Sequence, residues 1–170
     1  KNYTGKYSTL YSAFVSKNNE LGQAYMKGIM EMNPTAAAKM YPDANFSMRV
    51  SYGNVKSYSP RDAVKYDYVT TSRGVLEKYI PGDYEFDLPK KEIELFKNKD
   101  FGQYIDKKRN DLVIGFITTN DITGGNSGSP VMDAYGNLIG LAFDGNYEAL
   151  SHKIAFDKDL NRTINVDIRY

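Results

Sequence analysis

Apolar residues near the start of the chain recur every three or four positions. They do so over residues 7–15 and again over 21–32, which is the spacing of one face of an α-helix. The second run stops at Asn33-Pro34, and residues 35–40 predict one further helical turn or two. The two runs therefore predict the core faces of a helical hairpin.

The period changes after residue 43 and becomes typical of β-structure. Residues 46–52 alternate between apolar and polar side chains, as a half-buried strand does. Gly53-Asn54 favours a tight turn, so residues 55–58 are predicted to return as the second strand of a hairpin. Residues 63–71 form another β-like run.

The rest of the chain predicts one helix and several short strands. The apolar pattern is helical from residue 88 to 105. Strands are predicted at residues 112–118, 130–133, 138–143 and 163–170, the second and third forming a hairpin around 134–137. We therefore expect a helical segment over residues 1–40 and an antiparallel β-domain of about six strands over 41–170.

Composition narrows the function classes. The 170 residues suffice for one domain or a small pair, and the net charge of +1 gives no basic footprint for nucleic acid or a membrane surface. No stretch approaches the roughly 20 apolar residues that span a bilayer. Cysteine is absent, which excludes disulfides and thiolate metal sites. Because the chain opens on Lys1 and stops at a strand-like run ending in Tyr170, we expect a fragment of a longer protein.

The segment Gly125-Asn126-Ser127-Gly128-Ser129-Pro130 carries the most informative chemistry. Glycines let a backbone take positive φ and approach a bound carbonyl closely. Such a loop can direct successive N–H groups to one point, as a developing oxyanion requires. The pattern Gly-x-Ser-Gly-x-Pro is that of the nucleophile loop of chymotrypsin-type serine peptidases, which makes Ser127 the candidate nucleophile. The alternative is a Gly/Ser-rich surface turn between two strands.

Several further segments share a likeness to one family. They are Tyr41-Pro42-Asp43-Ala44-Asn45, Tyr58-Ser59-Pro60-Arg61-Asp62, Lys99-Asp100-Phe101-Gly102, the loop 120–131, and the segments 140–146 and 162–170. On these segments the chain resembles the bacterial dipeptidyl-peptidase 7 and 11 family of chymotrypsin-clan serine exopeptidases. The resemblance is specific over residues 41–170 and weak over 1–40.

The resemblance implies a fold. Family members are much longer, and their peptidase domain is a double β-barrel with a helical insert that caps the active site. The expected fold class is therefore mainly β with an α-helical N-terminal segment, namely a chymotrypsin-like second β-barrel plus the end of the helical insert. The family's Ser-His-Asp triad takes its His and Asp from the first barrel, so the isolated chain is expected to be inactive. No metal or other cofactor is implied.

The resemblance also implies an activity and partners. The parent protein would release dipeptides from peptides with a free N-terminus, preferring hydrophobic residues at the penultimate position, and would be periplasmic, secreted or on the bacterial cell surface. The missing N-terminal barrel of the same protein is the expected structural partner, with no nucleic acid and no membrane. Its absence would expose an inter-barrel face, which makes a homodimer a further expectation.

Four residues carry the expected substrate chemistry. Ser127 would attack the scissile carbonyl, and the N–H groups of Gly125 and Ser127 would form the oxyanion hole, as in related enzymes. Asp144 matches the family position that binds the α-ammonium of the substrate; the alternative is a strand-end Asp in an Asx turn. Gly145 matches the position where acid-preferring members carry a cation and hydrophobic-preferring members carry glycine. The alternative is a glycine kept for its turn.

Other residues invite functional interpretations that we set aside. Ser129 occupies the variable position before Pro130 and is assigned packing or hydrogen bonding. Asp121, six positions before Ser127, could select Lys or Arg as in trypsin-like enzymes, but a structural role in the loop is favoured. His152, the sole histidine, is interpreted as a surface residue, and Lys107-Lys108-Arg109 as a solvated loop. Two functions stay open as alternatives: a clan-related endopeptidase and a non-catalytic peptide-binding barrel.

Overall fold

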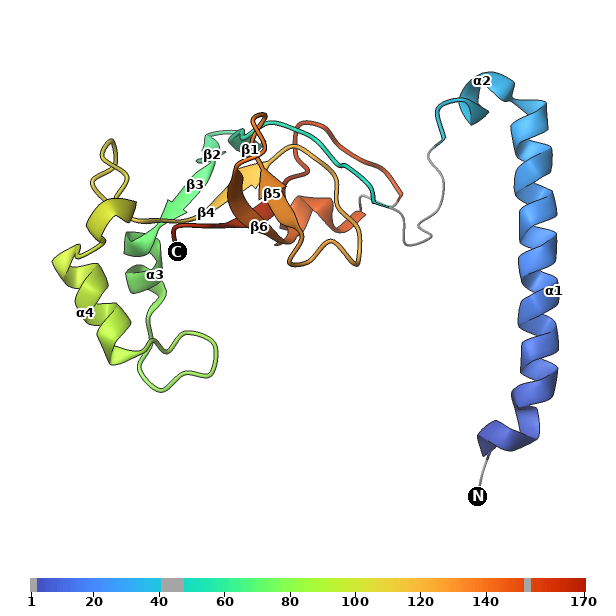
Figure 1. Ribbon diagram of the computed structural model, residues 1–170, viewed down its shortest axis with the longest axis horizontal. Coiled ribbons are helices and arrows are strands. Elements are labelled where there is room, and N and C mark those ends of the chain that lie inside the picture. Colours follow the sequence, from blue (N-terminus) through green and yellow to red (C-terminus); the bar gives the residue numbers. More distant parts are fainter. Residues whose placement is uncertain (1–2, 41–47, 152–153) are drawn as a thin grey trace. The chain divides into compact units, whose positions relative to one another are not determined.

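The computed structural model describes residues 3–40, 48–151 and 154–170 (Figure 1). The chain divides into two compact units, residues 1–48 and 49–170, and each is described by itself. Two predicted features lie outside the described residues. These are the segment 41–47, which includes the start of the first predicted strand, and His152.

The first unit contains one long helix, α1 (Tyr3–Met32). The prediction of a helical hairpin is wrong, because the chain does not turn between the two apolar runs. Residues 16–20 contain neither glycine nor proline, the residues that interrupt a helix. Lys17 and Glu20 form an ion pair of 2.9 Å across one helical turn of this stretch. The two apolar runs are therefore parts of a single helix.

Apolar side chains of α1 stay exposed within this unit. Tyr11, Phe14 and Tyr25 are 69%, 67% and 70% exposed. Most side chains of the predicted core faces are therefore exposed in the described part of the unit, and only Val15, Gly28 and Ile29 among them are half-buried. None of the helices in the described ranges, α1 included, combines the length and apolar character that a membrane span requires.

A short second helix, α2 (Pro34–Ala37), confirms the helical turn predicted after Asn33. The N–H of Ala36 donates to Asn33 Oδ1 at 3.1 Å, so Asn33 caps the first turn. Pro34 begins the helix, at the position where the missing N–H of proline leaves no bond unmade.

The second unit is built on an antiparallel sheet. In its described residues the strand order is β3-β4-β7-β6-β5, with a separate hairpin of β1 and β2. The strands are β1 (Tyr58–Arg61), β2 (Val64–Tyr66), β3 (Val69–Thr71), β4 (Val113–Thr118), β5 (Pro130–Met132), β6 (Leu138–Gly145) and β7 (Thr163–Asp167). In the centre, β7 places Ile164 opposite Ile117 of β4 and Val166 opposite Leu141 of β6. The strands predicted over residues 112–118, 130–133, 138–143 and 163–170 are confirmed, with adjusted ends.

Two helices lie side by side at one end of this sheet (Figure 1), α3 (Ser72–Lys78) and α4 (Lys90–Asn98). They close the apolar core of the unit, in which Phe96, Phe101 and Leu112 are buried together. Two 3₁₀ helices follow in the chain, η1 (Gly102–Tyr104) and η2 (Tyr147–Ser151). The predicted helix 88–105 is thus shorter, and α3 was not predicted. The chain is a mixed structure of helices and antiparallel sheets, so the expectation of a mainly β chain is too narrow.

The hairpin predicted over residues 46–58 is wrong in its described part. Residues 48–54 form no strand, and Val55 makes only an isolated bridge to Thr118. Met48, Val50 and Tyr52 are 93%, 79% and 90% exposed, so their alternation has no buried face to stabilise a strand. The segment instead follows the chain beyond β4, where the N–H of Thr119 donates to the carbonyl of Asn54 at 3.0 Å.

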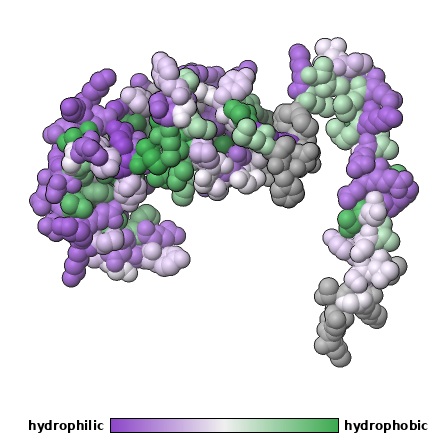
Figure 2. Space-filling view, viewed as in Figure 1, coloured by the Kyte–Doolittle hydropathy of each residue, from purple (hydrophilic) through white to green (hydrophobic). Residues whose placement is uncertain are grey.

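The sheet unit also exposes apolar surface. On β6 the side chains of Leu138, Leu141 and Phe143 are exposed. Figure 2 shows hydrophobic and hydrophilic areas side by side on the visible face of this unit. The unit therefore keeps apolar strand positions that nothing covers in its described residues.

Candidate active site

The loop that carries Ser127 consists of two consecutive turns. The N–H of Asn126 donates to the carbonyl of Thr123 at 3.1 Å, and the N–H of Ser129 donates to the carbonyl of Asn126 at 2.8 Å. Gly125 and Gly128 each hold the third position of a turn, with φ of 106° and 79°. A type II turn needs positive φ at this position, and glycine supplies it without strain. The glycines of the motif are thus explained by the backbone of the loop.

Strand β6 fixes the loop from one side. The N–H of Gly128 donates to the carbonyl of Ala142 at 2.7 Å, and the N–H of Ala142 donates to the carbonyl of Ser129 at 2.9 Å. These bonds lie directly after Ser127, whose Oγ lies 3.5 Å from the carbonyl oxygen of Phe143. The Ser127 side chain is exposed. The serine hydroxyl is therefore held beside β6 and open to solvent.

Two backbone N–H groups of the loop are left without acceptors. Among the described residues, the N–H groups of Gly125 and Ser127 donate no hydrogen bond, whereas the N–H of Asn126 between them is used in the first turn. Thr123 closes the turn further, because its N–H donates to Asn126 Oδ1 at 2.9 Å. The loop thus offers the two free donors that an oxyanion hole requires.

Ser127 lies on a cavity of about 200 Å³. The cavity is bounded by the nucleophile loop, the end of β6 with η2, and the segment that leads into β7. Its lining residues are Asn120, Asp121, Ile122, Thr123, Gly124, Ser127, Phe143, Asp144, Gly145, Asn146, Ala149, Leu150, Phe156, Asn161, Arg162 and Thr163. Ser127, Asp144 and Gly145 are therefore brought together from two segments of the chain.

A local irregularity places Asp144. The register between β6 and β7 shifts between Ala142 and Asp144, and such a bulge turns a side chain away from the regular alternation. Asp144 is exposed, and its Oδ1 accepts the N–H of Gly145 at 2.8 Å. One carboxylate oxygen is thus used locally, while the side chain still faces the cavity.

Close packing favours glycine at position 145. Its φ does not lie in the left-handed region, so a turn conformation does not demand glycine here. A Cβ at this position would lie 3.2 Å from the Cβ of Ala149, closer than most side-chain contacts. The glycine therefore lets η2 approach the end of β6, and it leaves this wall of the cavity without a side chain.

Polar residues outside the motif hold the wall of the cavity. Glu148 Oε2 accepts the side-chain N–H of Asn146 at 2.7 Å and the hydroxyl of Tyr58 at 2.9 Å. Asn146 Oδ1 accepts the backbone N–H of Arg162 at 2.8 Å. Burial raises the pKa of Tyr58, and the bond to the Glu148 carboxylate acts in the same direction. This network ties η2 to β1 and to the start of β7.

Arg162 is buried, with 2% of its surface exposed. Its guanidinium donates to carbonyl oxygens of residues 56–57 and of the residues directly before it in the chain, and it lies 5.3 Å from the centroid of the Tyr58 ring. The acceptors are Lys56 at 3.1 Å, Ser57 at 3.1 Å, Lys158 at 3.3 Å and Asn161 at 2.7 Å. Sequence reasoning did not single out Arg162, Asn146, Glu148 or Asn161. The first two stood only within segments of family likeness.

The remaining predicted residues have different outcomes. Asp121 lines the cavity and its backbone carbonyl accepts the hydroxyl of Ser51 at 2.5 Å; the role of its side chain stays a prediction.

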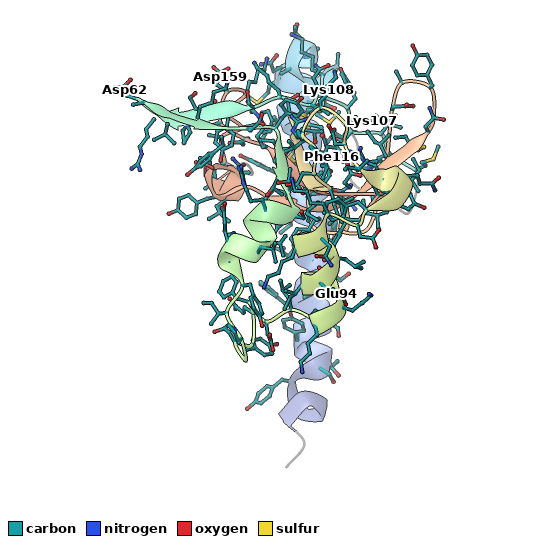
Figure 3. All side chains as sticks on the ribbon, turned by 90° about the vertical axis from the view of Figure 1, so that its left-hand side faces the viewer. Asp62, Glu94, Lys107, Lys108, Phe116 and Asp159 are labelled. Carbon is teal, nitrogen blue, oxygen red and sulfur yellow. The ribbon has the colours of Figure 1, made fainter. Side chains whose placement is uncertain are left out.

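Lys107 and Lys108 line a second cavity of about 520 Å³ together with Phe116, and Figure 3 labels all three. Arg109 is not simply solvated, because it lies over the Tyr68 ring at 5.1 Å and pairs with Asp106 at 3.7 Å. Within the described ranges, no three His, Cys, Asp or Glu side chains gather into a metal-binding group.

Known proteins similar to this chain are peptidases. A model of the Peptidase S46 family matches residues 5–170. An Asp/Glu-specific dipeptidyl-peptidase of Flavobacterium psychrophilum is 48% identical over 169 residues, covering 99% of this chain and 23% of that protein. Dipeptidyl-peptidase 7 of Capnocytophaga gingivalis is 54% identical over 150 residues, covering 86% of this chain and 20% of that protein.

A solved structure shows the same arrangement of elements. The crystal structure of Porphyromonas endodontalis DPP11 in complex with the dipeptide Arg-Glu matches with a TM-score of 0.83 at 36% identity, over 98% of this chain and 23% of that one. The chain thus spans less than a quarter of the length of the relatives it matches. The family model matches nearly all residues, and the fold agrees with that of the solved relative. The chain therefore belongs to the Peptidase S46 family.

Proposed function

We propose that this chain forms the C-terminal part of the peptidase domain of a longer serine dipeptidyl-peptidase. The observation that carries the proposal is the cavity on which Ser127 and Asp144 meet beside two free backbone N–H groups. A nucleophile, donors for an oxyanion and a carboxylate for an ammonium are the groups that release of an N-terminal dipeptide needs.

In the proposed reaction, Ser127 Oγ attacks the carbonyl carbon of the second peptide bond of the substrate. The hydroxyl proton passes to a histidine of the first barrel, which returns it to the leaving amine as the C–N bond breaks. The N–H groups of Gly125 and Ser127 bind the oxyanion that forms. A water molecule then releases the dipeptide from Ser127. The general base lies on another part of the parent protein, so the isolated chain is inactive.

Asp144 supplies the preference for a free N-terminus. Its Oδ1 accepts the N–H of Gly145, and its second carboxylate oxygen makes no hydrogen bond among the described residues. A carboxylate binds an ammonium through a charge-assisted hydrogen bond, which an acetylated N-terminus does not form. An exopeptidase therefore follows from the same cavity, whereas a clan-related endopeptidase would not need this carboxylate.

Gly145 and its neighbours support a preference for hydrophobic residues at the penultimate position. An Asp/Glu-specific dipeptidyl-peptidase and a dipeptidyl-peptidase 7 both match the chain, so the proposed preference rests on the walls of the cavity. Apolar side chains on those walls include Phe143, Leu150 and Phe156. Among the described residues Arg162 is the only cation that lines the cavity, and its guanidinium donates to backbone carbonyls. An acidic substrate side chain would be buried there without a cation to neutralise it, at considerable cost.

The remaining parts of the proposal concern the parent protein. Residues 41–170 would form the second of two chymotrypsin-like β-barrels, and residues 1–40 the end of a helical insert that caps the active site. The apolar side chains exposed on α1 and β6 support contacts with the rest of the parent protein. Where the first barrel is missing, the same side chains would support a homodimer of this chain. A periplasmic or secreted location agrees with hydrolysis of extracellular peptides.

We expect Asp144→Asn to lower kcat/KM for dipeptide substrates with a free N-terminus by about 10- to 100-fold. The substitution keeps the shape and removes the negative charge, and hydrogen bonds to charged groups contribute about 1.5–3 kcal/mol. The measurement is release of a fluorophore from an unblocked dipeptide by the full-length protein that carries this chain. Asp62→Asn, on the turn at the tip of the β1–β2 hairpin (Figure 3), is the matched control and should leave kcat/KM unchanged. Equal values for the two variants would contradict the role of Asp144.

A further inference from the structure

Asn161 is the one buried side chain with unsatisfied polar atoms in the part of the chain that the structure describes. It is 2% exposed, and neither its Nδ2 nor its Oδ1 has a hydrogen-bond partner. Other buried asparagines differ: Asn165 Nδ2 donates to Thr118 Oγ1 at 3.0 Å, and Asn146 is bonded to Glu148. Buried polar groups without partners are uncommon in native proteins, and each calls for an explanation.

Asn161 lines the cavity that Ser127 and Asp144 also line. Its backbone is fixed, because its N–H donates to the carbonyl of Asp157 at 2.9 Å and its carbonyl accepts Arg162 Nη1 at 2.7 Å. The carboxamide, in contrast, is held by no hydrogen bond within the described residues. Rotation about its side-chain bonds toward the cavity therefore breaks no hydrogen bond of the free protein.

We propose that Asn161 is a specificity-determining residue that binds the end of the substrate side chain in the cavity beside Ser127. The inference rests on the proposed function, and it names the substrate class. An amide has both donors and an acceptor, so it is satisfied by a neutral group that also has both, such as a hydroxyl or another amide. An apolar side chain would leave both atoms unpaired, and a carboxylate would satisfy only Nδ2.

Tyrosine combines the two properties that the cavity presents. Its ring suits the apolar walls formed by Phe143, Leu150 and Phe156, and its hydroxyl can both donate to and accept from the Asn161 carboxamide. Phenylalanine has the same ring without the hydroxyl. A site with a hydrogen-bonding group for a substrate hydroxyl discriminates against the analogue that lacks it, because the buried group then stays unpaired. The cavity is thus expected to prefer tyrosine to phenylalanine.

The test uses the full-length protein that carries this chain and unblocked dipeptide substrates with Tyr or Phe at the penultimate position. We expect the wild type to favour Tyr in kcat/KM by about three- to tenfold, as one neutral hydrogen bond allows. Asn161→Leu, of similar size, should bring the ratio to about one while turnover of the Phe substrate persists. Asn161→Ala should do the same, and it covers the case in which the leucine variant does not fold.

The melting temperature separates substrate binding from a structural role for Asn161. The Asn161 carboxamide makes no internal hydrogen bond, so Asn161→Leu should leave the melting temperature unchanged, whereas a structural role would lower it. Asn165→Leu, which removes a bonded side chain, should lower the melting temperature. A Tyr/Phe ratio of one in the wild type, or an unchanged ratio in a folded Asn161 variant, would overturn the inference and leave the proposed function standing. A wild type that cleaves neither substrate would overturn the proposed function and the inference with it.

Discussion

Ser127→Ala should abolish turnover of dipeptide substrates by the full-length protein, with a loss of kcat on the order of 10⁶-fold. In the proposed reaction, the hydroxyl of Ser127 is the group that forms the covalent intermediate. Folding should be unaffected, because Ser127 is exposed and its Oγ makes only a long contact of 3.5 Å to the carbonyl of Phe143. The measurement is fluorophore release from an unblocked dipeptide, with melting temperature as the check on folding.

The loop supplies a matched control for this experiment. Ser129 lies two positions further on and contributes its backbone to the turn and to the contact with β6. Ser129→Ala removes a hydroxyl from the same loop, so its kcat should stay within a few-fold of the wild type. A Ser127→Ala variant that keeps even one per cent of the wild-type activity would contradict the assignment of the nucleophile. A Ser129→Ala variant whose activity falls as far as that expected for Ser127→Ala would contradict it as well.

Arg162→Met should lower the free energy of unfolding of this chain by about 3 kcal/mol or more. The substitution removes the donors that the carbonyl oxygens of Lys56, Ser57, Lys158 and Asn161 share. Methionine approximates the length of the aliphatic stem, so the loss measures the guanidinium more than the packing. The two segments that the guanidinium joins, residues 56–57 and 158–162, would separate, and the wall of the cavity would loosen with them.

Denaturant unfolding of the 170-residue chain measures this loss. Arg61→Met is the matched control, since Arg61 is an exposed arginine at the end of β1 and should change the free energy of unfolding by less than about 0.5 kcal/mol. Similar values for the two variants would show that the carbonyls around Arg162 find other donors, and the account of the wall would then be wrong.

Alternation of side chains predicted strands correctly only where one face is buried. Residues 163–167, within the alternating run 163–170, form β7, in which every second residue is buried. Residues 48–52 alternate equally well, yet Met48 and Tyr52 are more than 89% exposed and the segment forms no strand. A pattern shows which face a strand would bury, but not whether anything is available to cover it.

Helix predictions failed in a related way. The two apolar runs of α1 were interpreted as facing each other across a turn, but residues 16–20 contain no helix breaker and continue the helix. Helix α3 was missed because Ser72 to Lys78 follow a β-like run, and their helical position depends on contacts far along the chain. One such contact is the bond from the N–H of Ser72 to the carbonyl of Leu112 at 3.0 Å.

The site shows the same division between local and non-local information. The positive φ of Gly125 and Gly128 could be predicted, because the loop is a contiguous motif whose turns demand glycine at fixed positions, whereas the role of Ser127 as the nucleophile stays a prediction. The importance of Arg162 could not be predicted, because it arises from hydrogen bonds to Lys56 and Ser57, more than a hundred positions away. The importance of Asn161 could not either, because the burial of its side chain without a partner depends on the fold. In the sequence, Asn161 and Arg162 look like ordinary polar residues before a strand, and nothing indicates that both are buried.

The most direct measurement of the central claim compares two versions of one substrate with the full-length protein. One is a dipeptide with Phe at the penultimate position, a free N-terminus and a fluorophore as the leaving group, and the other is its N-acetylated form. A dipeptidyl-peptidase that binds the ammonium through Asp144 is expected to cleave the free form and to leave the acetylated form intact. Cleavage of both at similar rates would indicate an endopeptidase, cleavage of neither would favour a non-catalytic barrel, and either result would contradict the account.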